Sequence, residues 1–341
     1  MTDRTKQFVK LLIRILITTG LLIWVFSKID LEQFRQTAKT AKWWFLFAVW
    51  VLVVIIFWIN SIKMQLILKK QDCNVSIATL FGASAITLFY SMIIPGILST
   101  GVKWYILKKD TGKSSNVLSS MFYNQMSIIV VMMVFGLAAL MITNPTSLLN
   151  TDSNNRWLLP VVSGILLAAI ILISLLLLNG RTGGKIIKAF TLLLKPLPAK
   201  IHRNAQNILE QLAIFQSVGG KFHLTIASIT IIANLIGGVL IYFLSAKAAN
   251  ITAPVGVFVW LCAVVYILGR IPISVANLGV REFTLVGLLG IYGVEKSPAL
   301  LMSMILFSTV ILMAAIGAIY QLFWALTAKN RSPKVTAKLS L

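Results

Sequence analysis

Long apolar segments separated by short polar ones constrain this chain more than any other feature. Six segments of spanning length stand at residues 8–26, 43–60, 118–142, 158–178, 224–246 and 298–326. A hydrocarbon core about 30 Å thick takes roughly 20 residues of α-helix to cross. With 58% hydrophobic and 12% charged residues among 341, no polar block is long enough for a separate soluble domain. We therefore predict a single all-α domain over residues 1–341, a polytopic membrane protein with six full transmembrane helices.

Two further apolar regions, residues 77–107 and 255–291, are interrupted. The interrupting residues are Pro95, Gly96, Gly101, Pro272 and Gly279. Proline removes a backbone donor and clashes with the preceding turn, and glycine weakens a helix further. At membrane depth a broken backbone is tolerated only where protein or a water-filled cavity covers it. We predict that each region forms a re-entrant helical hairpin.

The two interrupted regions carry related motifs. In each, proline is followed by glycine, valine and a basic residue, which is Lys103 in the first region and Arg281 in the second. Residues 8–142 and 158–326 both read as span, amphipathic segment, span, hairpin, span. Interrupted segments at corresponding places in two halves indicate an inverted repeat with a binding site near the midplane. The alternative is that any long membrane protein can be cut into similar halves.

The charge of the chain is strongly positive, at +22. Its basic residues are scattered among apolar spans, so we expect anionic lipid headgroups as partners and no nucleic acid. A topology with the N-terminus, the segments 63–70 and 103–113, the amphipathic connection 179–223 and the basic tail 327–341 on one side places 22 of the 31 Lys and Arg there. Positive charge concentrates on the cytoplasmic side. We predict that both termini and this connection are cytoplasmic.

Arg281 and Glu282 are the leading candidates for a binding site. Of the 9 acidic residues, only Glu282 adjoins a break inside an apolar region. Charged groups at membrane depth are costly and tend to mark substrate paths or relays. Because adjacent residues on a helix do not face each other, we expect Arg281 to meet a ligand phosphate or another helix rather than Glu282. The alternative is a structural ion pair that ties the hairpin to a neighbouring helix.

Four other residues are assigned to the same predicted site: Lys103, Arg270, Asn277 and Asn124. Lys103 and Arg270 would add positive charge, and the N-terminal ends of broken helices also favour an anion. The alternative for both cations is snorkelling to the interface, where the aromatic Trp104 beside Lys103 would suit it. The alternative for Asn124, which lies inside a span, is a hydrogen bond between helices.

Metal and cofactor sites are not indicated. The chain has 2 cysteines and 2 histidines. The cysteines, Cys73 and Cys262, fall in different halves, and no cluster of metal ligands is present in the sequence. We expect no cofactor and no metal.

The motifs resemble the transmembrane region of bacterial lysylphosphatidylglycerol synthases and the stand-alone flippase-like membrane proteins related to it, over about residues 13–326. The resemblance lies in Pro95-Gly96 with Gly101 and Lys103, Arg270-Ile-Pro272, Gly279-Val-Arg-Glu282 and Gly293-Val294. It implies a paired-hairpin fold in a bacterial or archaeal inner membrane. It also implies a role in binding or moving anionic phospholipids, aminoacylated lipids or polyisoprenoid-linked glycans.

Two departures from the family pattern matter. Lysine stands at Lys63 and Lys103, where the family often has arginine, and lysine lacks the planar fork that grips phosphate bidentately. The soluble aminoacyl-transferase domain of the synthases is absent from this sequence, so the synthetic activity is not carried over.

Three classes of function follow from this sequence. The first hypothesis is a lipid translocase that binds an anionic headgroup between the hairpins. The second is a non-transporting accessory protein that binds lipid and scaffolds an envelope glycosyltransferase or lipid synthase, with residues 179–223 as its docking surface. The third, a membrane transferase, requires an acid/base constellation that one glutamate at membrane depth without a buried histidine does not supply. We therefore expect that the protein is not an enzyme.

Overall fold

The computed structural model of the chain describes residues 31–92, 96–147, 156–178, 183–184, 199–271, 274 and 277–330, and this part is helical, without strands. Five helical segments in it are long and apolar enough to cross a membrane. They are α3 (Trp44–Lys69), α6 (Ser114–Thr143), α7 (Leu158–Leu178), the continuous run of α10 (Gly220–Asn234), the π-helical turn η3 (Leu235–Leu240) and α11 (Ile241–Ala248), and α14 (Lys296–Asn330). Five of the six predicted spans are therefore confirmed. The first predicted span, residues 8–26, lies outside the described residues.

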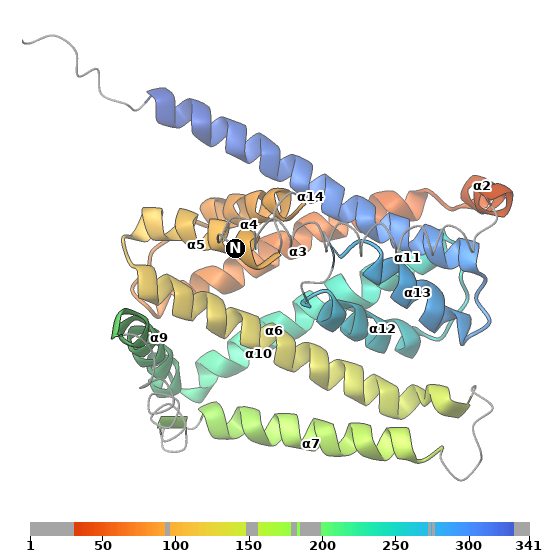
Figure 1. The fold of residues 1–341 in the computed structure, drawn as a ribbon, viewed down its shortest axis with the longest axis horizontal. Coiled ribbons are helices and arrows are strands. Elements are labelled where there is room, and N and C mark those ends of the chain that lie inside the picture. The colour runs from red at the N-terminus through yellow and green to blue at the C-terminus, as the bar shows by residue number, and fades with distance from the viewer. Residues whose placement is uncertain are drawn as a thin grey trace, which may run out of the picture.

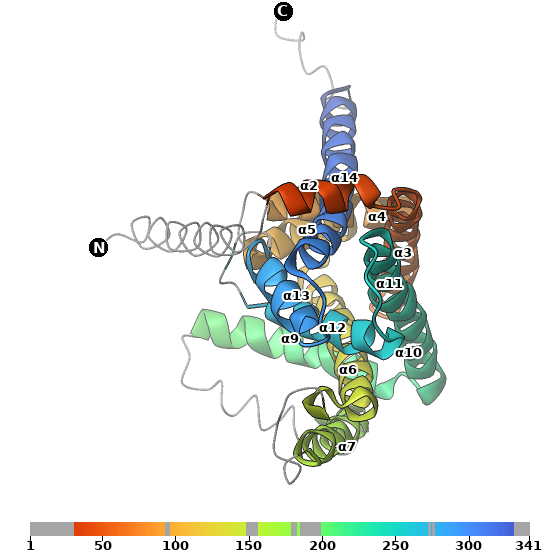
Figure 2. The ribbon, with the colours of Figure 1, turned by 90° about the vertical axis from the view of Figure 1, so that its right-hand side faces the viewer.

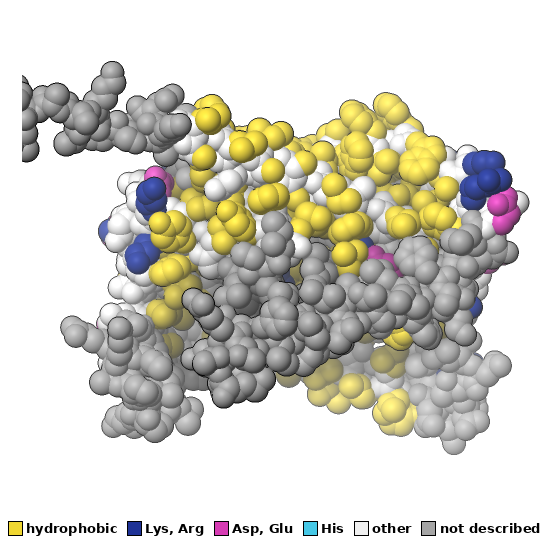
Figure 3. Space-filling view, turned by 45° about the horizontal axis from the view of Figure 1, so that its top comes forward, with side chains coloured by type: hydrophobic (Ala, Val, Ile, Leu, Met, Phe, Trp, Pro, Cys, Tyr) yellow, Lys and Arg dark blue, Asp and Glu magenta, His cyan; other side chains and the backbone are white. Residues whose placement is uncertain are grey.

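The long helices lie side by side and run roughly along the long axis of the molecule, so that their termini lie at its two opposite ends (Figure 1). Seen from the side, α7 lies on the outside of the bundle, against α6 (Figure 2). The space-filling view shows an apolar surface between charged groups at the two ends (Figure 3). This distribution suits a protein whose middle contacts lipid tails and whose ends contact water.

Two pairs of shorter helices stand where the sequence predicts interruptions. The first pair is α4 (Ile77–Ser91) with α5 (Gly96–Thr111), and the second is α12 (Val255–Leu268) with α13 (Val280–Gly290). The helices of each pair contact each other. The two pairs extend into the bundle from opposite ends (Figure 1).

Gly101 is not a break, and the prediction that it interrupts a helix is wrong. It lies inside α5, and a Cβ added there would meet nothing within 4 Å. A single glycine costs a helix only about 1 kcal/mol relative to alanine, so its neighbours carry the helix through it. The breaks within the described part are at Gly96, where α5 begins, and at Gly279, just before α13. Pro95 and Pro272 lie outside the described residues.

The closest helix packing joins α4 to α14. A Cβ built on Gly317 of α14 would lie 2.2 Å from the carbonyl oxygen of Ala85 on α4. Only a residue without a Cβ lets the two backbones approach this closely, as is common between membrane helices. This contact fixes the first short pair against the last long helix.

Two amphipathic helices lie at opposite ends of the bundle (Figure 1). The helix α2 (Leu31–Thr40) is held at one end by a hydrogen bond from Gln33 Nε2 to Glu295 Oε2 (2.8 Å). The helix α9 (Ala199–Ser217), from the connection 179–223, lies at the other end. Its Phe215 is 2% exposed and stacks on Tyr123 of α6, with ring centroids 4.3 Å apart. The amphipathic segment predicted between the first two spans and part of the amphipathic connection 179–223 are therefore helical.

Candidate functional site

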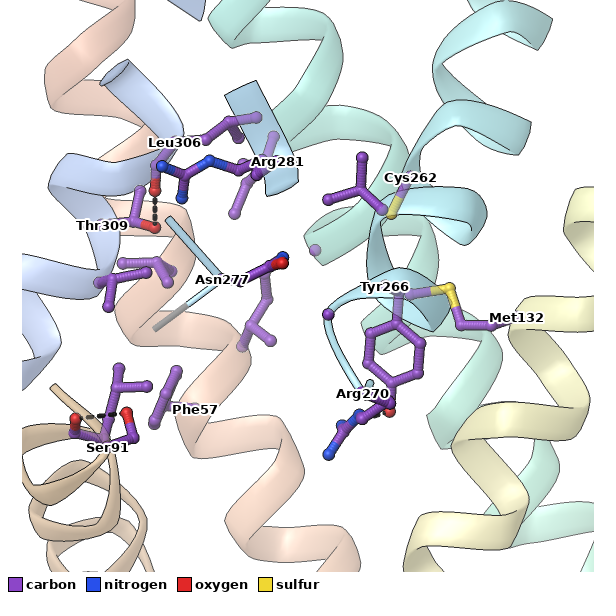
Figure 4. A pocket seen from close by; sticks show the side chains of 18 of the residues that line it. Phe57, Ser91, Met132, Cys262, Tyr266, Arg270, Asn277, Arg281, Leu306 and Thr309 are labelled. Atoms are coloured by element: carbon purple, nitrogen blue, oxygen red, sulfur yellow. Dashed lines mark hydrogen bonds between the residues drawn. The ribbon is translucent and has the colours of Figure 1, made fainter. Parts of the chain in front are cut away.

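A cavity of about 610 Å³ lies between the two short-helix pairs. Its walls come from α3, α4 and α5 on one side and from α11, α12, α13 and α14 on the others. Side chains of both pairs reach it, among them Ser91 of α4, Tyr266 of α12 and Arg281 of α13 (Figure 4). The π-helical turn that connects α10 to α11 also borders it, through Gly237. The broken helices therefore meet at a cavity in which polar side chains stand among apolar ones, rather than at a packed core.

Arg281 belongs to a buried ion pair that joins α13 to α14. Arg281 Nη2 donates to Glu282 Oε1, and Arg281 Nε donates to Ser303 Oγ of α14 (2.9 Å). Ser303 Oγ in turn donates to Glu282 Oε1 (2.9 Å). The guanidinium also lies over the ring of Phe307, 5.1 Å from its centroid. Arg281 and Glu282 are only 6% and 4% exposed.

The expectation that Arg281 would not meet its neighbour Glu282 is wrong. Both residues stand in the first turn of α13, where Glu282 folds back and accepts a hydrogen bond from the backbone N–H of Gly279 (2.7 Å). This capping contact brings the carboxylate beside the guanidinium, and Ser303 bridges the two. Gly279 makes the turn possible because its φ of 80° is costly for a residue with a Cβ. The structural ion pair, the alternative reading, is what the structure contains.

Arg270 lines the cavity from the end of α12. Its Nη2 donates to the hydroxyl of Tyr266 (2.6 Å), and its guanidinium lies 4.6 Å from the centroid of the same ring. Gln125 of α6 donates to that hydroxyl as well (3.0 Å). Tyr266 was not predicted from the sequence to be part of the site. Tyr266 stands four residues before Arg270, a spacing that places two side chains on one face of a helix, and this spacing could have indicated the contact.

Lys103 points inward rather than along the interface. Its Nζ donates to Ser84 Oγ of α4 (2.9 Å), and Ser84 lines the cavity although Lys103 itself does not. Lys63 of α3 is fully buried and donates to Thr230 Oγ1 (3.3 Å). The two ammonium groups lie close enough for their charges to interact. Lys63, which stands where the resemblance leads one to expect arginine, therefore belongs to the surroundings of the site.

The two predicted asparagines have different positions. Asn277 lines the cavity and adopts a left-handed conformation (φ 61°), and its carbonyl accepts a hydrogen bond from the backbone N–H of Arg281 (3.1 Å). Asn124 does not line the cavity. Its Oδ1 is buried and has no hydrogen-bond partner among the described residues. The structure thus brings Arg270, Asn277 and Arg281 together and leaves Asn124 apart.

The charges around the cavity do not cancel. Arg281 is balanced by Glu282, whereas Arg270, Lys103 and Lys63 form no ion pair with any acid in the part of the chain that the structure describes. Across the same residues, no group of three His, Cys, Asp or Glu side chains could hold a metal ion. Lys63 is buried and Lys103 is partly buried, where charges are normally paired, whereas Arg270 is exposed. The excess positive charge therefore suits an anionic ligand.

The long apolar helices define a multi-pass membrane protein, with an internal cavity between its two pairs of shorter helices. The chain belongs to the family described as the lysylphosphatidylglycerol synthase TM region, whose family profile matches residues 11–318. The resemblance seen in the motifs is thereby confirmed. No curated protein and no solved structure compared with the chain gives a match.

Proposed function

We propose that this protein binds the anionic headgroup of a lipid in the cavity between the two short-helix pairs and moves it across the bilayer. The main support for this proposal is the positive charge of Arg270 and Lys103, which no acid among the described residues balances, at a cavity lined by both short-helix pairs. Guanidinium and ammonium groups bind phosphate through charge-assisted hydrogen bonds. The apolar tails would stay in the bilayer while the headgroup passes. The substrate class is an anionic phospholipid, an aminoacylated lipid or a polyisoprenoid-linked glycan, and we propose no enzymatic step.

We further propose that both pairs are re-entrant hairpins related by an inverted repeat. The two pairs extend into the bundle from opposite ends, and each reaches the cavity (Figure 1). In transporter folds, such related halves let a central site face each side of the membrane in turn. The arrangement therefore supports movement of a headgroup past a fixed set of cations.

A lipid-sidedness assay tests the proposed movement. Purified protein is reconstituted into vesicles of phosphatidylcholine and phosphatidylglycerol that carry a trace of fluorescent phosphatidylglycerol. A membrane-impermeant reductant then bleaches the outer leaflet. We expect the protein to expose the inner-leaflet fluorescence to the reductant faster than in vesicles with heat-inactivated protein. Equal bleaching rates, together with retained lipid binding, would favour the non-transporting accessory protein instead.

The orientation of the chain is also proposed. The basic ends of α3 and α5 lie with α9 at one end of the molecule, and we propose that this end faces the cytoplasm. Single cysteines at Ser153 and Ser217, in a background without Cys73 and Cys262, test this on intact cells. A membrane-impermeant thiol reagent should label the cysteine at position 153 and leave that at 217 unmodified. The reverse pattern would invert the topology.

A further inference from the structure

One wall of the cavity offers hydrogen-bond acceptors. It contains hydroxyl groups from α4 and α14 that donate to carbonyl oxygens of their own helices: Thr87 to Ala83 (2.6 Å), Ser91 to Leu88 (2.7 Å) and Thr309 to Leu306 (2.7 Å). A carbonyl oxygen only accepts, so the single hydrogen of each hydroxyl is already used. The oxygen lone pairs remain for a ligand. In this arrangement the wall presents acceptors to a ligand, which suits groups that donate hydrogen bonds.

The other wall offers donors. Arg270 lies across the cavity from Ser91 and Thr309 (Figure 4). A guanidinium carries five N–H donors and no acceptor, and the structure assigns one of them to Tyr266. A ligand that satisfies both walls has a phosphate for Arg270 and, on the same headgroup, donors for the hydroxyl wall.

Electrostatics decides which donor fits. Hydroxyl and ammonium groups both donate, but an ammonium adds positive charge to a cavity that Arg270 lines and whose Ser84 accepts a hydrogen bond from Lys103. Neither cation has an acid partner within the described ranges. Glu282, the acid near the cavity, is already engaged by Arg281, Ser303 and the Gly279 N–H. Like charges repel, whereas neutral hydroxyls carry no such cost.

We infer that the headgroup is a phosphate ester of a polyol, that is, a phosphoglycerol or phosphosugar, and that an aminoacyl headgroup is disfavoured. This inference rests on the proposed function and narrows its substrate class. The phosphate binds at Arg270, and the polyol hydroxyls donate to Thr87, Ser91 and Thr309.

Water-soluble dihexanoyl lipids test the inference by isothermal titration to the purified protein. We expect phosphatidylglycerol to bind more tightly than phosphatidic acid, which lacks the polyol, and more tightly than lysyl-phosphatidylglycerol, which adds amines. Phosphatidylinositol distinguishes a sugar alcohol from glycerol as the preferred polyol. Tighter binding of lysyl-phosphatidylglycerol than of phosphatidylglycerol would overturn the inference without any variant being made.

Two substitutions locate the effect. Thr87→Val and Thr309→Val keep the side-chain shape and should each weaken phosphatidylglycerol binding about fivefold, with phosphatidic acid unchanged. The control is Thr284→Val, since Thr284 is buried and donates to Val280 O (2.7 Å) but does not line the cavity. Equal losses for both lipids, or none, would contradict the polyol wall.

The same titrations distinguish a failure of the proposed anion site from a failure of the polyol inference alone. If none of the anionic lipids binds, or if Arg270→Gln leaves all of their affinities unchanged, the cavity is not an anion site. If Arg270→Gln weakens every anionic lipid while the two valine variants change none, the anion site stands and the polyol inference fails.

Discussion

Arg281→Gln is expected to lower the free energy of unfolding by about 3–5 kcal/mol, because it leaves Glu282 buried without its partner. The pair is almost entirely removed from solvent, and Ser303 and the Gly279 N–H alone cannot replace a guanidinium. The change should appear as a lower melting temperature and a lower yield of detergent-solubilised protein.

The double variant separates architecture from binding. Arg281→Gln with Glu282→Gln removes both charges and should restore most of the lost stability. The matched control is Arg35→Gln, which breaks an exposed pair with Glu32 (3.1 Å) on α2 and should cost no more than about 1 kcal/mol. A normal melting temperature for Arg281→Gln with lost lipid binding would instead make Arg281 a ligand residue.

The apolar pattern predicted much of the fold. Hydropathy alone placed the spans around α3, α6, α7, α10–α11 and α14, because backbone groups in lipid must be satisfied within a helix. The amphipathic pattern of the segment between the first two spans and of the connection 179–223 indicated the helices α2 and α9. The effect of a glycine depends on its surroundings. Gly279 precedes a helix because the turn there needs a positive φ, whereas Gly101 lies inside α5 and does not interrupt it.

The site was predicted less completely, since its contacts join helices far apart in the chain. Sequence singled out Arg281 and Glu282, but their pairing depends on Ser303 of α14 and on a capping turn. The sequence indicated Arg270 but not its partner Tyr266. It also could not show that the hydroxyl of Thr87 donates its hydrogen to a carbonyl oxygen of its own helix. These features arise only when the two short pairs meet.

The structure also changes the relative importance of the two arginines. Arg281 is neutralised by Glu282 and clamps α13 to α14, whereas Arg270 reaches the cavity from the end of α12 without an acid partner among the described residues. The ring of Tyr266 supports Arg270, and its hydroxyl accepts one hydrogen bond from the guanidinium. We therefore propose Arg270, rather than Arg281, as the principal phosphate-binding residue.

Arg270→Gln is expected to weaken binding of anionic lipids about tenfold or more. A hydrogen bond to a charged group contributes about 1.5–3 kcal/mol, and glutamine keeps polarity without the charge or the fork. Folding should be unaffected, because Arg270 is exposed and holds no buried acid. The control is Arg156→Gln, an exposed arginine in the connection before α7 that does not line the cavity.

The most direct measurement is therefore a titration of dihexanoyl phosphatidylglycerol into the unmodified protein, Arg270→Gln and Arg156→Gln, at equal melting temperatures. We expect saturable binding to the unmodified protein and to Arg156→Gln, and an affinity lower by about tenfold or more for Arg270→Gln. Equal affinities for all three proteins would show that the lipid phosphate does not bind in this cavity.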